Sequence, residues 1–270
     1  MTPDRKDANL LLSTQGSDGV LRLTLNDPDR RNALSEAMLA ALDETFDAAS
    51  TNPDVRVIVL AAVGPVFCAG HDLKEMTTGR QNADRGRAYF TKILNQCSSV
   101  MQKIVTCPKP VIAEIDGVAT AAGCQLVATC DLAVASKEAQ FCTPGVHIGL
   151  FCSTPMVALS RNLTNKHVME MLLTGDMMPA ARAAEMGLVN KVVPSAKLRA
   201  ASMALAGKIA AKSSLTVATG KRAFYQQKEM DLEAAYNYAS KIMVDNMLAR
   251  DAKEGIAAFI EKRVPDWRDE

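Results

Sequence analysis

The sequence predicts an α/β protein that ends in a purely helical region. Two apolar runs rich in β-branched residues, 55–60 and 111–115, have the length and composition of strands covered on both faces. Between such runs lie segments whose apolar residues recur at helical spacing, for example 84–106. From residue 200 onward the pattern is helical throughout. We therefore expect strand–strand–helix or strand–helix units over 1–195 and a helical region over 196–270.

The elements follow one another in an order that supports this organisation. In residues 19–25, leucines alternate with Arg22 and Thr24, which predicts a half-buried strand. Ser35 is placed to cap a helix whose apolar stripe includes Leu39 and Phe46. The later expected elements are strands at 55–60, 111–115, 132–135 and 189–193, and helices at about 84–106, up to 129, 155–161, 165–173, 179–187 and 231–249.

Composition and charge exclude several classes of protein. The chain has 270 residues, of which 48% are apolar and 23% charged, and its formal charge is only +1. This balance argues against a nucleic-acid partner, which usually requires a basic stripe. No apolar run approaches the roughly 18 residues of a membrane span, so no membrane partner is expected. Because residues 1–7 lack a hydrophobic stretch, a cytoplasmic location is the expectation.

The seven cysteines indicate buried, reduced thiols. Their number is odd, and no two have the C-x-x-C spacing of a zinc or redox site. The three histidines, His71, His147 and His167, also lack a metal-ligand spacing. We therefore expect neither a metal site nor a disulfide framework.

Two loops of small residues are the best candidates for a functional site. Residues 67–73 and 116–126 each follow a predicted buried strand, and the second leads into a helix. Small residues allow a ligand to approach the backbone, and the first turn of a helix presents unpaired N–H groups. Two such loops that converge on one carbonyl oxygen would form an oxyanion hole. The alternative is tight packing between layers, which requires the same residue types.

Several short segments occur in a specific order along nearly the whole chain. They are 31–34 (Arg-Asn-Ala-Leu), 67–73, 110–116, 122–126, 130–135, 173–175, 184–193 and 251–265. In this order and spacing, the chain resembles the crotonase (enoyl-CoA hydratase/isomerase) superfamily. The resemblance implies the crotonase fold, a spiral of ββα units with a C-terminal helical trimerisation region. It also implies a homotrimer, possibly a dimer of trimers.

The resemblance further implies a coenzyme A thioester as substrate, with no separate cofactor. The backbone N–H groups of His71 and Ala122 would form the oxyanion hole; Ala122 replaces the more usual glycine, so its φ must be negative. The implied acyl-CoA contacts are Arg31, Ala33, Ala69, Asp72, Leu73, Gly145, Phe259 and Lys262. Without a ligand, Asp72 would serve as a helix cap, and Arg30 and Arg31 would lie in a solvated turn.

The two carboxylates that hydratases of this family use are absent from their matching positions. Gln125 stands at the first, and Gly145 at the second. Neither residue can act as a general acid or base, so standard hydration is not expected. If only the carboxylates are missing, Gln125→Glu combined with Gly145→Glu should restore it.

Two side chains remain as candidates for catalysis. Gln125 can hydrogen-bond a substrate or a water molecule. His147 would point the same way as Gly145 if its loop is extended, and its pKa range suits a general base. The alternative for His147 is a hydrogen-bonded structural residue.

The predicted function is that of an acyl-CoA-binding protein, enoyl-CoA hydratase/isomerase-like, that stabilises a thioester enolate. Weak hydration, double-bond isomerisation, thioester hydrolysis and decarboxylation stay open as reactions. Decarboxylation forms an enolate without a base. The alternative class is a non-catalytic acyl-CoA-binding or assembly subunit.

Overall fold

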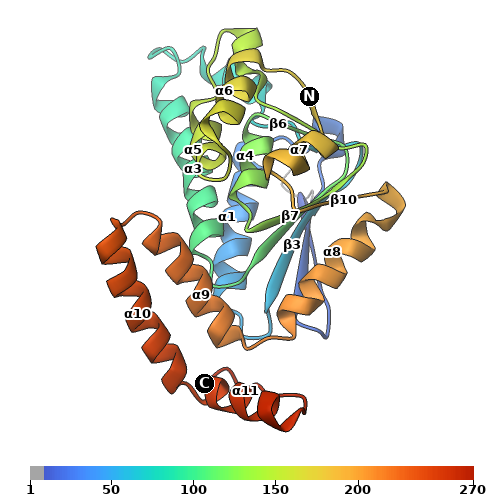
Figure 1. Ribbon diagram of the computed structural model, residues 1–270. Coiled ribbons are helices and arrows are strands. Elements are labelled where there is room, and N and C mark those ends of the chain that lie inside the picture. Colours follow the sequence, from blue (N-terminus) through green and yellow to red (C-terminus); the bar gives the residue numbers. More distant parts are fainter. Residues whose placement is uncertain (1–8) are drawn as a thin grey trace.

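A six-stranded sheet forms the centre of residues 9–270, which are the part of the chain that the computed structural model describes (Figure 1). Only its first pair of strands is antiparallel; the other neighbours run parallel. In spatial order the strands are β1 (Leu11–Gln15), β2 (Val20–Leu25), β3 (Val57–Ala62), β5 (Val111–Ile115), β7 (Leu132–Ser136) and β10 (Lys191–Val193).

A second, smaller sheet lies beside it and is built from very short strands. These are β4 (Val66–Cys68), β6 (Val118–Thr120), β8 (Gln140–Cys142) and β9 (Met178–Pro179), in that order. From β3 to β8, consecutive strands alternate between the sheets, so that β3 and β4, β5 and β6, and β7 and β8 each form one repeating unit. This arrangement confirms the predicted α/β class and its strand–strand–helix units.

Helices cover both faces of the large sheet. One core cluster joins one face of the sheet to α1, α3 and α4, and a second cluster joins the opposite face to α8. The helices are α1 (Glu36–Thr51), α2 (Leu73–Gly79), α3 (Arg87–Thr106), α4 (Ala122–Thr129), α5 (Ser153–Ser160), α6 (Asn165–Thr174), α7 (Ala180–Met186), α8 (Ser195–Ala210), α9 (Ser214–Gln227), α10 (Leu232–Leu248) and α11 (Arg250–Glu261), with 3-10 turns η2 (Pro28–Arg30) and η3 (Pro144–Ile148). Within this part of the chain, no helix is both long enough and apolar enough to cross a membrane.

The longer elements agree with the sequence-based expectations. The N-cap of α1 is Ser35, whose Oγ accepts the N–H of Met38 at 3.1 Å. In contrast, β1, β4, β6, β8 and β9 were not expected. Residues 118–120 had been assigned to a loop, and they form the middle strand of the small sheet. Pairing with neighbouring chain segments, rather than a local pattern, stabilises strands of two or three residues.

The C-terminal helices divide into two parts. The first, α8, packs on the large sheet through Leu198 and Ala206 and so belongs to the core. The next two, α9 and α10, have no buried residue. The helices α9–α11 are called the arm below, and in Figure 1 its α10 and α11 extend away from both sheets.

A cluster of polar side chains attaches the arm to the core at α9. The ammonium group of Lys221 donates to Asp131 Oδ2 at 2.7 Å, and its side chain is only 6% exposed. The hydroxyl of Tyr225 donates to Asp131 Oδ1 at 2.9 Å. Because Asp131 also accepts the N–H of Val111 at 2.7 Å, α9 is connected directly to the start of β5.

The last residues fold back to fix α11. The guanidinium of Arg263 makes two hydrogen bonds to Glu254, of 2.5 and 3.0 Å, and the N–H of Asp266 donates to Glu254 at 2.8 Å. The indole N–H of Trp267 donates to the carbonyl of Ala211 at 3.0 Å. The tail thus connects α11 to the end of α8.

Acid should release this tail. The Arg263 guanidinium and the N–H of Asp266 lower the pKa of Glu254 from 4.5 to about 2. The stabilisation is therefore complete above about pH 4.5 and is lost as the pH falls through about 2. We expect the emission of Trp267, the single tryptophan, to change over this interval before helical circular dichroism is lost. Glu254→Gln should show the changed emission already at pH 7, whereas Glu233→Gln, a change of an exposed residue, should not. If the emission of Glu254→Gln depends on pH as that of the parent does, Glu254 does not hold the tail.

Candidate functional site

The two small-residue loops are in direct contact. Gly70 has a φ of +83°, and a Cβ built on it would lie 3.0 Å from the Cβ of Ala121 and 3.1 Å from the nitrogen of Ala122. A Cβ on Gly123 would lie only 2.1 Å from the carbonyl oxygen of Cys68. The hydroxyl of Thr120 adds a hydrogen bond to the carbonyl of Ala69, at 3.0 Å. The loops contact each other through backbone approaches that larger residues would prevent, a packing that agrees with both interpretations of their small residues.

Asn32 is a structural residue of this site that the sequence analysis did not single out. It is fully buried, and its amide donates to the carbonyls of Val63 and Val66 at 2.9 and 2.7 Å. Two residues later, the N–H of Leu34 donates to the carbonyl of Gly70 at 2.8 Å. The segment 31–34 therefore holds the first loop from behind. The local sequence carries no signal of this role, because Asn32 follows Arg31 in a polar turn, and its burial becomes visible only in the fold.

The two N–H groups implied by the resemblance lie on these contacting loops. Ala122 is the first residue of α4, where N–H groups have no intrahelical partner. His71 pairs with Leu34 through an isolated bridge in which the carbonyl of Gly70 accepts the N–H of Leu34. Within residues 9–270, neither the N–H of His71 nor that of Ala122 donates to a protein acceptor. Because Ala122 has a helical φ, an alanine is compatible with this position. The preceding residue, Ala121, has a positive φ of 51°.

Gln125 lies one helical turn after Ala122 and is 4% exposed. Side chains of a helix point toward its N-terminus, so the amide of Gln125 is directed toward the turn that Ala122 begins. Among the described residues, its Oε1 has no hydrogen-bond partner. A buried acceptor of this kind at the start of α4 is available to a ligand.

The ring of His71 is buried close to the backbone of Leu34. Both ring nitrogens are buried and have no partner among residues 9–270. Burial lowers the pKa of His71, and the backbone of Leu34 offsets only part of this effect. The ring is therefore neutral near pH 7.

The loop that contains Gly145 and His147 is not extended, and the expectation that these residues point the same way is wrong. Residues 144–148 form η3. A Cβ on Gly145 would lie 2.9 Å from both Cys152 Sγ and the carbonyl oxygen of Leu150. The loop thus fills the space that a side chain at position 145 would need, and the double glutamate replacement cannot simply be accommodated.

The imidazole of His147 packs against the end of α6. Its Nε2 lies 2.8 Å from the carbonyl oxygen of Thr174, and a Cβ on Gly175 would lie 3.0 Å from the same nitrogen. In this position, the ring connects η3 to the C-terminus of α6. A catalytic role for His147 stays a prediction.

The carboxylate of Asp72, one of the implied ligand contacts, makes hydrogen bonds and an ion pair within the protein. Its carboxylate accepts the N–H groups of Lys74 and Glu75, at 2.8 and 3.2 Å, and so caps α2. It also pairs with Arg30 at 3.0 Å, and Arg30 reaches Glu75 at 3.3 Å. In contrast, Arg31 is exposed and has no recorded side-chain partner within residues 9–270.

The remaining implied contacts occupy two separate places. Ala69 and Leu73 lie on the first loop and Ala33 on the segment 31–34 behind it; the N–H of Ala69 donates to the carbonyl of Arg31 at 3.1 Å. Phe259 and Lys262 belong to α11 and its C-cap, and Phe259 is 86% exposed. In Figure 1, α11 lies at the end of the arm, away from α4. A single chain therefore does not bring these two residues to the loops.

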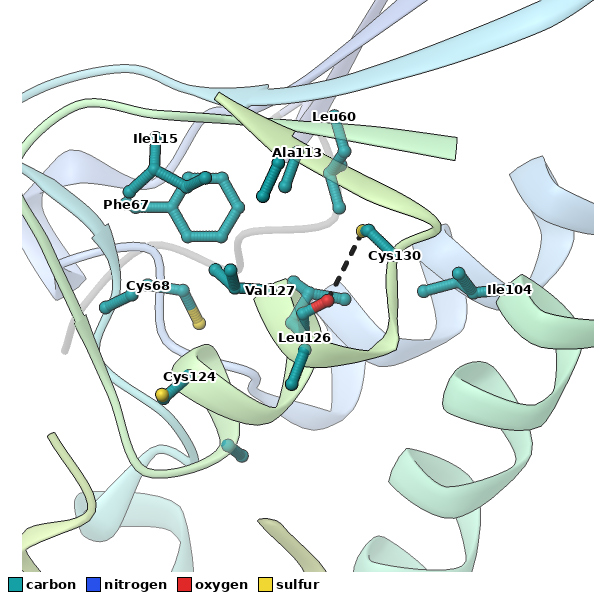
Figure 2. Packing of buried hydrophobic residues seen from close by; sticks show 14 of the residues in the cluster. Leu60, Phe67, Cys68, Ile104, Ala113, Ile115, Cys124, Leu126, Val127 and Cys130 are labelled. Atoms are coloured by element: carbon teal, nitrogen blue, oxygen red, sulfur yellow. Dashed lines mark hydrogen bonds between the residues drawn. The ribbon is translucent and has the colours of Figure 1, made fainter. Parts of the chain in front are cut away.

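All seven cysteines are buried and free, as predicted. Figure 2 shows Cys68, Cys124 and Cys130 among the apolar side chains around α4, with the thiol of Cys130 donating to the carbonyl of Leu126 at 3.3 Å. Burial raises the pKa of Cys68 to about 12, and burial together with neighbouring Cys152 raises that of Cys142 to about 11. Such thiols are poor nucleophiles. Within the described residues, no group of three His, Cys, Asp or Glu side chains is placed to hold a metal ion.

Comparison with known proteins identifies the family. The family model described as "Enoyl-CoA hydratase/isomerase" matches residues 15–270. The chain belongs to the enoyl-CoA hydratase/isomerase family. It is 49% identical over 257 residues to the mouse enoyl-CoA hydratase domain-containing protein 3, mitochondrial, which covers 95% of this chain and 84% of the relative. It is 32% identical to 2,3-dehydroadipyl-CoA hydratase of Escherichia coli, covering 97% and 99% of the two chains.

Solved structures of this family confirm the crotonase fold. The Mycobacterium smegmatis enoyl-CoA hydratase superposes with a TM-score of 0.92 at 50% identity, covering 96% of this chain and 99% of the other. The human enoyl-CoA hydratase domain-containing protein 3 gives 0.90 at 46% identity, covering 96% and 100%. Residues 122–128 and 143–155 predict similarity to the enoyl-CoA hydratase domain-containing protein 3 subgroup. The mouse and human relatives confirm this prediction. Because several relatives are named as mitochondrial, the cytoplasmic expectation stays a prediction.

The packing around Gly145 leads to a test of how this member of the family is built. Gly145→Ala should lower the free energy of unfolding by about 1–3 kcal/mol, because the added methyl overpacks the loop. Adding Cys152→Ala should recover part of this loss by removing Sγ, while the carbonyl of Leu150 still clashes. Urea unfolding measures both effects. Gly220→Ala, where a Cβ meets nothing within 4 Å, should be stabilising instead. A Gly145→Ala variant as stable as the parent would contradict this prediction, because it would show that the loop moves to make room for the methyl group without loss of stability.

Proposed function

We propose that this protein binds acyl-CoA thioesters and polarises the acyl carbonyl between the backbone N–H groups of His71 and Ala122. The observation that carries the proposal is the pair of N–H groups, on two loops in contact at Gly70, that donate to no acceptor in the described part of the chain. In other enzymes, one such donor contributes about 2.7–4 kcal/mol to transition-state stabilisation. An enolate places its negative charge on this oxygen, so the site favours enolate formation. The name of a relative, 2,3-dehydroadipyl-CoA hydratase, supports the CoA thioester as ligand class.

The reaction is not standard hydration. Gln125 presents a neutral amide where family hydratases use a carboxylate, and Gly145 lies in a packed loop without room for one. Each missing acid or base lowers the rate by about 10²–10⁴-fold. The site keeps the groups that stabilise an enolate and lacks the groups that move protons to and from carbon.

This combination favours decarboxylation as a second, more specific proposal. In a thioester with a carboxylate on its α-carbon, the bond to the carboxylate breaks, carbon dioxide leaves, and the electron pair moves into the enolate. Water then protonates the α-carbon. No base is needed, and the neutral amide of Gln125 does not repel the substrate carboxylate. The alternative is a non-catalytic acyl-CoA-binding or assembly subunit.

The reaction is tested by mass spectrometry of a pool of 2-enoyl, 3-enoyl, malonyl-type and saturated acyl-CoA thioesters. We expect loss of carbon dioxide from malonyl-type members. Gln125→Glu should reverse the preference, because its carboxylate repels the substrate carboxylate and supplies one of the two groups that hydration needs. Gln125→Ala is the control without charge. Binding of free CoA as tightly as butyryl-CoA would contradict carbonyl recognition; binding without any turnover would support the non-catalytic alternative.

We also propose that the chain assembles into a cyclic homotrimer. The arm formed by α9–α11 exposes large apolar side chains, and a second apolar surface lies at 148–177. Those on the arm include Phe224, Leu232, Tyr236, Met243, Leu248 and Phe259; those on the second surface include Ile148, Leu150, Phe151, Val157, Met169 and Leu173. Two different apolar surfaces that contact each other between copies generate a ring when the rotation between copies closes, and a rotation of one third of a turn gives a trimer. Such a ring would bring Phe259 and Lys262 to a neighbour's CoA.

Assembly should depend on the arm. Leu248, 81% exposed, is a point where a charge opposes burial without affecting the core. Leu248→Glu should shift the sedimenting species from three times the 29.0 kDa chain mass toward one. Lys241→Glu, an exposed charge change on the same helix, should leave it unchanged. Removal of everything after Val193 is a poor test, because it also removes α8 from the core. A monomeric parent protein would contradict the proposal.

A further inference from the structure

The residue immediately before the second N–H group has an unusual backbone conformation. Ala121 has φ 51° and ψ −119°, in a region that glycine enters freely and that a Cβ disfavours. Non-glycine residues in such regions persist only where the surrounding structure determines them, and they concentrate at functional sites. Ala121 is therefore strained at the point where β6 turns into α4.

Both sides of Ala121 are fixed by hydrogen bonds. Its N–H donates to the carbonyl of Cys142 at 2.9 Å, and its carbonyl accepts the N–H of Gln125 at 3.0 Å. The first bond connects it to β8, and the second belongs to the first turn of α4. The peptide that carries the N–H of Ala122 therefore cannot rotate without breaking a contact to one of these neighbours.

The methyl group of Ala121 separates the two loops. A Cβ built on Gly70 would lie 3.0 Å from the Cβ of Ala121, so this methyl packs against the backbone of Gly70. Gly70 is the residue before His71. The same methyl that causes the strain thus sets the spacing between the two N–H groups.

We propose that Ala121 is a positioning residue, whose strained alanine conformation holds the N–H of Ala122 in register with that of His71. This inference rests on the proposed carbonyl polarisation. Glycine at position 121 would adopt the same φ and ψ without strain, but it would lack the methyl and permit other conformations. The alanine is strained, but its conformation keeps the two N–H donors in fixed positions before a ligand binds. An oxyanion hole requires donors that are preorganised in this way.

The test is Ala121→Gly in the full chain, with butyryl-CoA labelled with carbon-13 at the thioester carbonyl as the probe. Infrared difference spectra report polarisation directly, since a hydrogen-bonded carbonyl absorbs at lower frequency. We expect wild type to lower the carbonyl frequency. Ala121→Gly should show a smaller and broader shift and several-fold weaker binding, while its thermal midpoint is raised or unchanged. A structural role alone would not reduce the carbonyl shift in a variant that has lost no stability.

Ala139→Gly is the matched control. Ala139 is fully buried, its φ is not positive, and it lies between β7 and β8, outside the two loops. This variant should be less stable and keep the wild-type carbonyl shift. If Ala121→Gly keeps the wild-type shift and affinity, or loses stability as Ala139→Gly does, the inference is overturned. If wild-type protein binds butyryl-CoA without any carbonyl shift, the proposed function falls, and this inference with it.

Discussion

The close approach of two backbone segments is the constraint on which the rest of this structure depends. A Cβ on Gly117 would lie 1.9 Å from the carbonyl oxygen of Pro65, and one on Gly123 would lie 2.1 Å from that of Cys68. These contacts hold the segment before β6 and the first turn of α4 against β4. Any larger residue would separate β4 from β6 and so displace the loop with His71 from that with Ala122.

The core holds this contact in place from both sides. Beneath it, Phe67 and Val127 lie in one apolar cluster with the strands of the large sheet (Figure 2). Behind it, the buried amide of Asn32 is hydrogen-bonded to the segment between β3 and β4. The backbone donors therefore lie on a rigid scaffold, which permits strain such as that of Ala121 to persist. The parts with few buried contacts, α9–α11, are the parts available for contact with other copies.

The sequence predicted those parts of the fold that local pattern determines. Strands such as β2, β3 and β5 and helices such as α3 have a local pattern of their own, and the small residues of 67–73 and 116–126 indicated the candidate site. Three-residue strands such as β4 and β8 carry none, because pairing at a distance stabilises them. The course of residues 144–148 depends on Leu150 and Cys152, which no local pattern reveals. The positive φ of Ala121 was not predicted, because only the pairing of β6 with its neighbours determines where that strand ends and α4 begins.

The absence of the second carboxylate is built into the fold and is more than the loss of a side chain. If Gly145 were a glutamate reduced to glycine, a space would remain where the side chain had been. Instead, the thiol of Cys152 and the carbonyl of Leu150 occupy that space, and the ring of His147 connects the same turn to α6. At the first position, the amide of Gln125 is buried, and its oxygen has no hydrogen-bond partner among residues 9–270. The packing at both positions is therefore consistent with the proposal that the backbone N–H groups, and not carboxylates, act on the ligand.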